Sequence, residues 1–591
     1  MARIDPHSYT DDTQPRVRHF VLHARVDFEA RQLTAEVTLH LAQPTTNAAT
    51  LDLDTRALSI DGIRAATGDA LAFTLHPADP ILGARLAIEL PAAIDRLTIR
   101  YRTSPEASAL QWLSPAQTLG KRQPFLFSQC QAIHARSVLP CQDTASIRQT
   151  YDAILDVPSA LRAVMAAEPL RREERGDRAL EHFTMPQSIP PYLFAFAVGE
   201  LASRELSRRC RVWGEPGCVD AAAWEFADVE RMLHAAEALF GPYDWERFDL
   251  LVMPPSFPYG GMENPRLTFL TPALLAGDRS LVNVVAHELA HSWSGNLVTQ
   301  ATAEHFWLNE GFTVFAERRI LAALSGQDEA MLHAALGARA LEQTIAQLAA
   351  HPELTRLHTQ LAGIDPDEAF SIVPYEKGYL FLKTLEAHLG EERFDRLLAR
   401  WFARHRFGAV TTADFVRLCE ELEPGALASI DASGWLDRPG LPDGWRPRSD
   451  RLLAIEAFAG TVPSPEATAT WSATEWQLFL EATPRPATPT LCRALDEQFA
   501  LRTAKNPEVQ VAFLVLAVES GDDSVLPDVD AMLARFGRMK YLKPLYRALC
   551  KRPSTRAHAE ALFARLKSGY HPIAVQVVQA IFKAPTGAAT S

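Results

Sequence analysis

Cysteines are few in this sequence, and they form no recognisable pattern. The 591 residues contain seven cysteines, which are widely spaced and include no C-x-x-C pair. A disulfide framework or a cysteine zinc site would need closely and regularly spaced cysteines. The pattern therefore argues against both and favours a reducing compartment.

Long hydrophobic stretches are also absent. The longest apolar runs, such as residues 511–518, are far shorter than the roughly 20 residues that a membrane-spanning helix needs. The N-terminal residues carry charges and a proline, whereas a secretory signal requires an apolar stretch. We therefore expect a cytoplasmic protein with no membrane partner.

Positive charge is in deficit. The sequence has 59 lysines and arginines against 72 aspartates and glutamates, which gives a net charge of −13. A protein whose main task is to bind nucleic acid needs a basic face for the phosphate backbone. We therefore expect no nucleic-acid partner.

Length and periodicity predict several domains. A domain usually has about 100 to 200 residues, so 591 residues are too many for one small module. Residues 1–200 look rich in strands because apolar and polar side chains alternate, as in residues 33–41. Residues 201–440 have helical periodicity instead, in segments near 222–240, 280–295, 307–325 and 328–350.

The last part of the chain follows a linker. Proline and glycine are concentrated around residues 441–452, which predicts a connection between domains. Residues 453–591 contain short amphipathic segments, and Ser472 with Glu475 predicts a capping box at the first of them. The expected fold class is multidomain α+β, with an N-terminal β-sheet or sandwich domain, a mainly helical central domain and a solenoid-like α-helical C-terminal domain.

The segment HELAH, residues 287–291, carries the most chemical information. It lies in a stretch without internal glycine or proline and with helical periodicity. On a helix, His287 and His291 lie one turn apart on one face, so both imidazoles can reach one cation. Imidazole nitrogen is a common zinc ligand. The neighbouring Glu288 is placed to act as a general base towards a water molecule without being a ligand.

A zinc site of this kind needs a third protein ligand. Three downstream carboxylates are candidates: Glu304, Glu310 and Glu317. We favour Glu310, because its apolar neighbours would hold it inside a second helix. Glu317 shares its face and is placed to support a ligand through a hydrogen bond. Two histidines and one glutamate leave a fourth position for water, which is typical of a catalytic zinc site.

The motifs resemble a known family. HELAH, followed after eighteen residues by Glu310 within WLNEGF, resembles the gluzincin aminopeptidases, the family of aminopeptidase N and leukotriene-A(4) hydrolase. The upstream segment PYGGMENP, residues 258–265, is similar to the GxMEN element of that family. The resemblance implies a thermolysin-like catalytic domain and one zinc ion per chain.

The same resemblance implies roles for residues around the metal. Glu263 would bind the free α-ammonium group of a peptide, which restricts cleavage to the first residue. Tyr375, within SIVPYEKGYLFL, would donate a hydrogen bond to the oxyanion of the tetrahedral intermediate. Substrate would also contact the segment that precedes Glu263, where glycine lets the backbone approach closely: Gly260, Gly261 and Met262.

Three further segments are similar to the leukotriene-A(4) hydrolase branch of the family: SQCQAIHAR (128–136), IDPDEAF (364–370) and GRMK (537–540). This similarity implies that Gln131 helps to bind the substrate N-terminus. It also implies that Arg538 and Lys540, on the C-terminal domain, face the substrate carboxylate.

The IDPDEAF segment departs from the branch at one position. Phe370 stands where the mammalian member has tyrosine, whereas Asp367, the residue associated with epoxide hydrolysis, is present. Asp367 is therefore a candidate either for that second activity or for shaping a peptide pocket.

The expected function is that of a zinc-dependent aminopeptidase, a hydrolase acting on short peptides with a free N-terminus. Glu288 would serve as the general base at a zinc held by His287, His291 and Glu310. The alternative is a bifunctional or epoxide-hydrolysing enzyme that uses the same metal. A catalytically silent peptide-binding scaffold is disfavoured, because Glu288 is intact.

Overall fold

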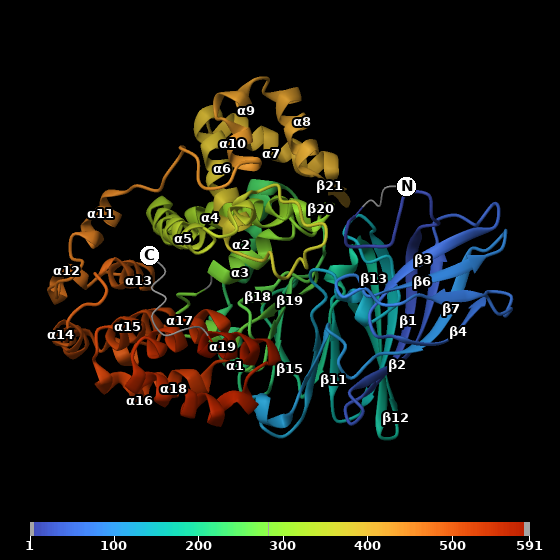
Figure 1. Cartoon of the computed structure of the whole chain (residues 1–591), viewed down its shortest axis with the longest axis horizontal. Coiled ribbons are helices and arrows are strands. Elements are labelled where there is room, and N and C mark those ends of the chain that lie inside the picture. Colours follow the sequence, from blue (N-terminus) through green and yellow to red (C-terminus); the bar gives the residue numbers. More distant parts are fainter. Residues whose placement is uncertain (1–4, 282, 584–591) are drawn as a thin grey trace.

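The computed structural model describes residues 5–281 and 283–583. Strands of the N-terminal part lie on one side, helices of the C-terminal part lie on the other, and a mixed region lies between them (Figure 1). This arrangement confirms the predicted multidomain α+β class. We propose the division predicted from the sequence, with domains at 1–200, 201–440 and 453–591.

The N-terminal domain is built around a seven-stranded sheet in the order β12-β13-β10-β1-β2-β7-β4. The first two strands pair antiparallel, and β1 pairs parallel with β10. Along β2 every second side chain is buried, as the alternation of residues 33–41 predicts. The strand bounds are β1 Val17–Asp27, β2 Gln32–Leu41, β4 Ser59–Ala65, β7 Arg96–Arg102, β10 Gln149–Pro158, β12 Glu168–Arg175 and β13 Arg178–Ile189.

Two smaller sheets complete this domain, in the orders β3-β6-β5 and β11-β14-β9-β8. The two inner strands of the second sheet, β14 and β9, are buried at every position, and the edge strands β11 and β8 are buried in part. The bounds are β3 Ala49–Thr55, β5 Phe73–Leu75, β6 Ala84–Leu90, β8 Leu110–Leu113, β9 Phe125–Ser128, β11 Arg162–Met165 and β14 Phe196–Gly199.

The central domain opens with a five-stranded sheet that the sequence patterns did not predict, in the order β15-β16-β17-β19-β18. Two of its inner strands, β17 and β19, are short and fully buried, and periodicity alone cannot distinguish such runs from buried helix. The edge strand β18 holds two residues of the GGMEN segment and pairs antiparallel with β19. The bounds are β15 Ala202–Glu205, β16 Arg211–Gly214, β17 Asp249–Val252, β18 Gly261–Met262 and β19 Leu267–Leu270.

Helices cover this sheet and carry most of the predicted site. The segment predicted near 222–240 is broken in two, at residues 226–228, and the other predicted helices are present. A short parallel pair, β20 Val298–Gln300 and β21 Gly408–Val410, links the helices. The helix bounds are α1 Val219–Glu225, α2 Val229–Phe240, α3 Asn283–Ala290, α4 Trp307–Ser325, α5 Gln327–Gln347, α6 Val373–Leu389, α7 Glu391–His405, α8 Thr412–Leu422, α9 Ala426–Ser429 and α10 Ala432–Leu436.

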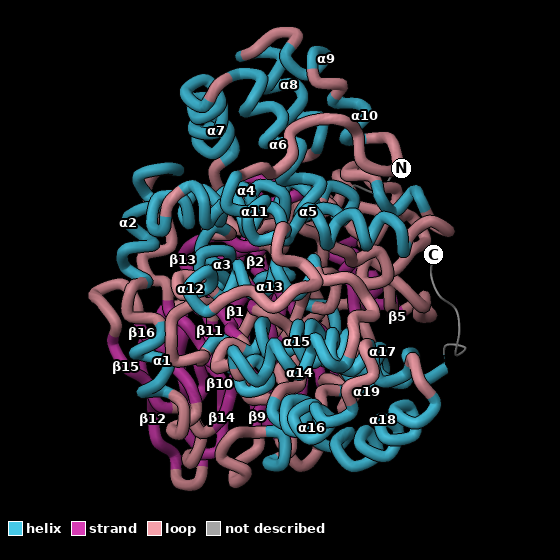
Figure 2. The backbone as a smooth tube through the Cα atoms, turned by 90° about the vertical axis from the view of Figure 1, so that its left-hand side faces the viewer, coloured by secondary structure: helices cyan, strands magenta, loops and turns pink. Residues whose placement is uncertain are grey.

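The C-terminal helices stack beneath the central domain (Figure 2). Residues 437–449 form no helix or strand, and α11 begins at Asp450, inside the predicted linker of residues 441–452. The capping box at Ser472 is present, since its side chain accepts from the Glu475 N–H. The bounds are α11 Asp450–Glu456, α12 Pro465–Thr468, α13 Ala473–Ala482, α14 Pro489–Phe499, α15 Pro507–Glu519, α16 Leu526–Arg535, α17 Met539–Cys550, α18 Pro553–Leu566 and α19 Pro572–Lys583.

Two hydrophobic cores hold the parts together. One core runs through both the N-terminal and the central domains, and the second lies under the C-terminal helices and includes Leu332 and Ala335 of α5. Among the described helices, none combines the length and the apolar character that crossing a bilayer requires. The continuous first core means that the N-terminal domain forms a fixed wall of the central one.

Candidate functional site

The two histidines of HELAH lie on one face of α3, as their spacing predicts. The helix ends at Ala290, and a further bond from the His291 N–H to the His287 carbonyl, 3.3 Å long, continues the helical turn through His291. The two imidazole rings are 4.9 Å apart between centroids. Both can therefore direct a nitrogen at the same point.

Glu310, in the first turn of α4, supplies an oxygen at that point. Its Oε2 lies 3.5 Å from His287 Nε2 and 3.6 Å from His291 Nε2. The same Oε2 is buried and has no hydrogen-bond partner. A buried carboxylate oxygen without a partner is costly, whereas a cation between it and two imidazoles would satisfy all three atoms. The three residues therefore fit a divalent metal ion, and zinc prefers this donor set.

The outer nitrogens of both rings are also held. His287 Nδ1 lies 3.0 Å from Glu317 Oε2, and His291 Nδ1 lies 3.1 Å from the Ser294 carbonyl oxygen. Both acceptors favour a proton on Nδ1, which leaves Nε2 with its lone pair free for a metal. Glu317 is thus close to a histidine, as predicted, and not in the three-residue group.

Glu304, the remaining candidate ligand, lies elsewhere. Its Oε1 accepts a hydrogen bond of 2.9 Å from the Leu361 N–H, and its backbone carbonyl accepts from the Thr359 N–H. Glu304 therefore anchors the segment before Asp367 and does not reach the histidines as Glu310 does.

Glu288 faces the same space from α3 and is 6% exposed. Burial raises the pKa of its carboxyl well above the ordinary value; the nearby His287 opposes this shift, and the carboxylates of Glu263 and Glu310 add to it. A divalent cation at the histidines would lower that pKa again, towards the ionised form that accepts a proton.

The backbone of Gly261 lies directly against the Glu288 carboxylate. A Cβ atom at position 261 would be only 2.2 Å from Glu288 Oε1. Any other residue at this position would displace the carboxylate, so the close approach requires glycine. The GGMEN segment therefore fixes the position of Glu288 from the other side of the site.

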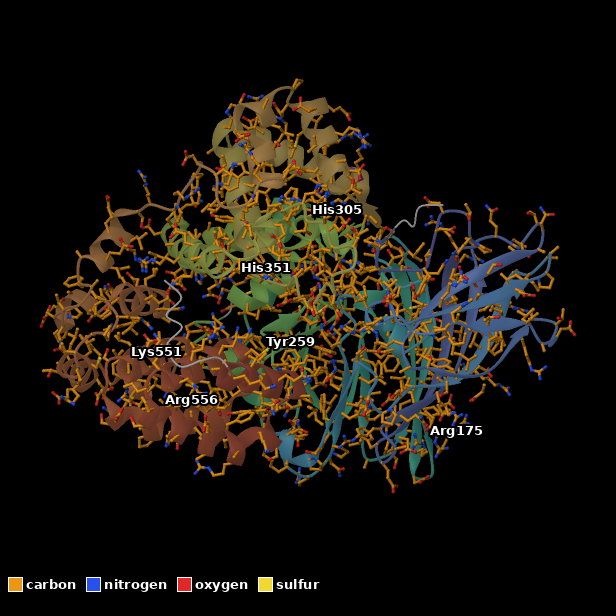
Figure 3. The ribbon with its side chains drawn as sticks, viewed as in Figure 1. Arg175, Tyr259, His305, His351, Lys551 and Arg556 are labelled. Carbon is orange, nitrogen blue, oxygen red and sulfur yellow. The ribbon has the colours of Figure 1, made fainter. Side chains whose placement is uncertain are left out.

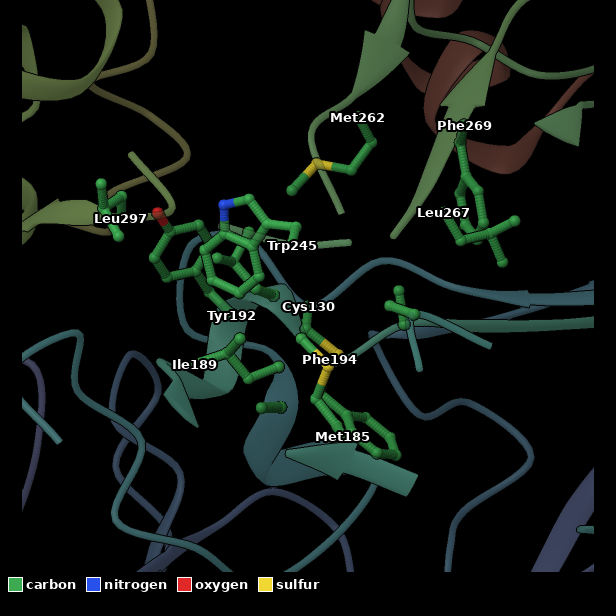
Figure 4. Packing of buried hydrophobic residues seen from close by; sticks show 14 of the residues in the cluster. Cys130, Met185, Ile189, Tyr192, Phe194, Trp245, Met262, Leu267, Phe269 and Leu297 are labelled. Carbon is green, nitrogen blue, oxygen red and sulfur yellow. The ribbon is translucent and has the colours of Figure 1, made fainter. Parts of the chain in front are cut away.

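Glu263 is buried beside the metal-binding group, with 4% of its surface exposed. Gln131, from the N-terminal domain, donates a hydrogen bond of 3.1 Å from Nε2 to Glu263 Oε1, and Asn296 donates one of 2.7 Å to the Glu263 carbonyl oxygen. Met262 packs into the first hydrophobic core, in the region that contains Tyr192 and Trp245 (Figure 4). These contacts hold the glutamate between two domains.

Tyr375 lies on the opposite side, in the first turn of α6. Its ring stacks on His287 with centroids 6.1 Å apart and an angle of 16° between the planes. Burial and the neighbouring carboxylates of Glu310 and Glu263 raise the pKa of its phenol, so the O–H remains a donor. Helices α4 and α6 meet through glycine, since a Cβ at Gly311 would lie 2.8 Å from Gly378 Cα.

Asp367 lies in a loop of the central domain but contacts the N-terminal domain. Its Oδ2 is 2.8 Å from His134 Nε2, and its side chain is half exposed. Tyr259, which precedes the two glycines, lies near the middle of the molecule (Figure 3). Burial raises the pKa of Tyr259, and the Asp367 carboxylate adds to the shift. His134 belongs to the SQCQAIHAR segment, but its spacing alone does not reveal this contact.

Arg538 and Lys540 share one acidic partner, Glu508. Arg538 Nη1 lies 2.9 Å from Glu508 Oε1, and Lys540 Nζ lies 2.8 Å from Oε2. Arg538 is buried and directs Nη2 towards Gly260, where a Cβ atom would lie 3.0 Å from that nitrogen. Nothing local in the sequence marks Glu508, in the first turn of α15, as the partner of these two residues.

Family models match all three parts of the chain. The peptidase family M1 domain covers residues 224–435, the peptidase M1 N-terminal domain covers residues 6–193, and the leukotriene A4 hydrolase C-terminal model covers residues 471–582. Leucine aminopeptidase 2 of Neurospora crassa is 37% identical, over 97% of this chain and 90% of its own. Leukotriene A-4 hydrolase of Xenopus laevis is 38% identical, over 97% of this chain and 98% of its own.

Solved structures agree with these matches. Native yeast LTA4 hydrolase superposes with a TM-score of 0.91 at 32% identity, over 98% of this chain and 97% of that one. An M1 zinc metallopeptidase from Deinococcus radiodurans, 22% identical, shares the fold over 76% of this chain with a TM-score of 0.60. The predicted family and the predicted architecture are confirmed, and the chain belongs to the peptidase M1 family.

Proposed function

We propose that this chain is a zinc-dependent aminopeptidase that removes the first residue from short peptides. One observation carries the proposal: a metal-binding group of two histidines and a glutamate lies beside two further buried carboxylates, Glu263 and Glu288. A hydrolase that uses a metal needs one proton acceptor near the metal. An enzyme that requires a free amino terminus needs a second carboxylate for the ammonium group.

The metal would be one zinc ion per chain, held by His287, His291 and Glu310. When bound, zinc polarises a carbonyl group and makes water more acidic. The unpartnered Glu310 Oε2 and the two oriented imidazoles support this assignment. Relatives named as aminopeptidases over nearly the full chain support it as well.

The surrounding residues would each perform one step. Glu288 accepts a proton from the attacking water and delivers it to the leaving amine. Tyr375 donates its O–H to the oxyanion that forms on the scissile carbonyl. Glu263, with Gln131 beside it, accepts hydrogen bonds from the substrate ammonium group, while Gly261 and its neighbours let the substrate backbone approach.

Arg538 is the better placed of the two predicted carboxylate-binding residues. Both residues pair with Glu508, but Arg538 Nη2 faces Gly260, whereas the Lys540 side chain is exposed. We propose that Arg538 meets the carboxylate end of a short peptide and that Lys540 contributes charge from further out. We also propose a reducing, cytoplasmic location, because the widely spaced cysteines suit such a compartment.

A second activity, hydrolysis of a lipid epoxide, is the alternative. It is favoured by the half-exposed carboxylate of Asp367 and by relatives named leukotriene A-4 hydrolase. A lipid epoxide assayed on the same zinc-loaded preparation, beside an aminoacyl arylamide, separates the two. Turnover of the arylamide alone supports the aminopeptidase, and turnover of both supports a bifunctional enzyme.

The first test asks whether hydrolysis requires a free amino terminus on the substrate. We expect leucyl arylamide to be hydrolysed and its N-acetylated form to be inert, because acetylation removes the charge that Glu263 binds. Replacing Glu263 by glutamine is expected to lower kcat/KM by roughly 10- to 100-fold, the loss typical of a charge-assisted hydrogen bond. Steady-state assays of both substrates measure these effects.

The matched control is Glu230→Gln, at a half-buried glutamate on α2 that pairs with Arg209. This variant should keep the kcat/KM of the wild type. Equal hydrolysis of the blocked and the free substrate would contradict the proposed aminopeptidase and indicate an endopeptidase.

A further inference from the structure

His7, near the start of the chain, forms hydrogen bonds with the loop of residues 361–370 that contains Asp367. His7 is 1% exposed, and its Nε2 lies 3.0 Å from the Leu361 carbonyl oxygen and 2.9 Å from the Ile364 carbonyl oxygen. Carbonyl oxygens only accept hydrogen bonds, so Nε2 carries the proton and donates to both. Arg136 donates to the His7 carbonyl oxygen over 2.8 Å and fixes its backbone. The base of the loop is thus attached to the N-terminal domain.

A second histidine of the same domain holds the far end of this loop. His134 Nδ1 lies 2.9 Å from Arg56 Nη1, and a guanidinium nitrogen can only donate. Nδ1 is therefore the acceptor, and Nε2 carries the proton. The 2.8 Å contact to Asp367 Oδ2 is then a hydrogen bond donated by the ring. Ser108 Oγ lies 2.8 Å from Nδ1, and its hydroxyl can donate to the same nitrogen.

The end of the loop lies beside the tyrosine of the site. Phe370 packs against Tyr375 with ring centroids 5.9 Å apart, and the Tyr375 ring stacks on His287. Asp367 lies three residues before Phe370. The first side chain of a peptide leaves the chain one bond from the ammonium group, so it would lie close to Glu263. The end of the loop is therefore placed to form a wall beside that side chain.

We infer that His7 and His134 are positioning residues for substrate selectivity: from the N-terminal domain they hold the 361–370 loop so that Asp367 and Phe370 border the first side chain of the substrate. The inference rests on the proposed aminopeptidase function and adds to it a reason why the β domain contributes to specificity. Neither histidine touches the metal-binding group, so their loss should change the choice of substrate more than the chemical step.

Selectivity between first residues tests this inference. We expect His134→Leu to change the ratio of kcat/KM for lysyl and leucyl arylamides about five- to tenfold, mainly through KM, because Asp367 loses its donor. His134→Gln, whose amide can replace Nε2, should restore most of the ratio. Asp367→Asn should change the ratio in the same direction, and the double variant should add nothing to it.

Position 7 provides an independent measurement. His7→Leu should increase amide hydrogen exchange in residues 361–370 and raise KM several-fold with little change in kcat, and His7→Gln should reverse both. The control is His19→Gln, at a histidine of the same domain that bonds Thr150 over 2.8 Å. The amide hydrogen exchange of residues 361–370, the KM and the kcat of this control should match those of the wild type.

The outcomes separate the inference from the proposed function. An active wild type with an unchanged ratio in His134→Leu, or additive effects of positions 134 and 367, would overturn the inference alone. A zinc-loaded wild type without any aminopeptidase activity would overturn the proposed function. In that case, unchanged amide hydrogen exchange of residues 361–370 in His7→Leu would also refute the inference that His7 holds this loop. Increased exchange there would support it.

Discussion

Replacing Glu288 by glutamine is expected to abolish peptide hydrolysis while zinc remains bound. Glu288 is not one of the three proposed zinc ligands, His287, His291 and Glu310. Glutamine has the same shape as glutamate, so the metal site should persist. The amide cannot accept and return a proton. Loss of a general acid–base group usually costs about 10²- to 10⁴-fold in rate, and we expect a fall in kcat within this range.

Two measurements on one preparation decide this prediction. Zinc content per chain should equal that of the wild type, and kcat for leucyl arylamide should fall with KM almost unchanged, because the loss is specific to the transition state. Glu230→Gln again serves as the control that keeps both values. If the kcat of Glu288→Gln stayed within tenfold of the wild-type value, Glu288 would not be the general base.

Replacing Gly261 by alanine is expected to reduce kcat about 10²-fold, although only one methyl group is added. The new Cβ would lie 2.2 Å from Glu288 Oε1, so the carboxylate must move. A displacement of about 1 Å in a reacting group is enough for a loss of this size. The Glu288 side chain can rotate away, so the cost appears in the reaction more than in folding.

Thermal unfolding distinguishes this effect from a general loss of structure. The melting temperature of Gly261→Ala should stay close to that of the wild type while kcat falls. Gly62→Ala is the matched control, because a Cβ at Gly62 meets nothing within 4 Å. If Gly261→Ala retained full activity, the close approach of Glu288 to the GGMEN backbone would have no part in catalysis.

The local part of the site could be predicted from the sequence. His287, Glu288 and His291 follow from helical geometry within five consecutive residues, and the structure has the helix there. The same holds for the capping box at Ser472, whose signal lies within one turn. Helical geometry alone did not identify the third ligand, because three carboxylates were candidates. Only the packing of α4 against α3 distinguishes Glu310 from the other two.

The remaining part depends on contacts between distant segments. His134 meets Asp367 across 233 positions of the sequence, and Glu508 meets Arg538 by joining two helices of the C-terminal domain. No periodicity or spacing encodes such pairs. The sheet that carries β18 was missed for a related reason, since its short buried strands have no alternating polar face.

The proposed enzyme depends on zinc at the two histidines and Glu310, and anomalous diffraction at the zinc edge would locate the ion. Crystals of the zinc-loaded protein should show one strong peak per chain, within roughly 2.0–2.2 Å of His287 Nε2, His291 Nε2 and a Glu310 oxygen. A peak elsewhere, or a Glu310 carboxylate that stays out of reach of the ion, would contradict the proposed metal site.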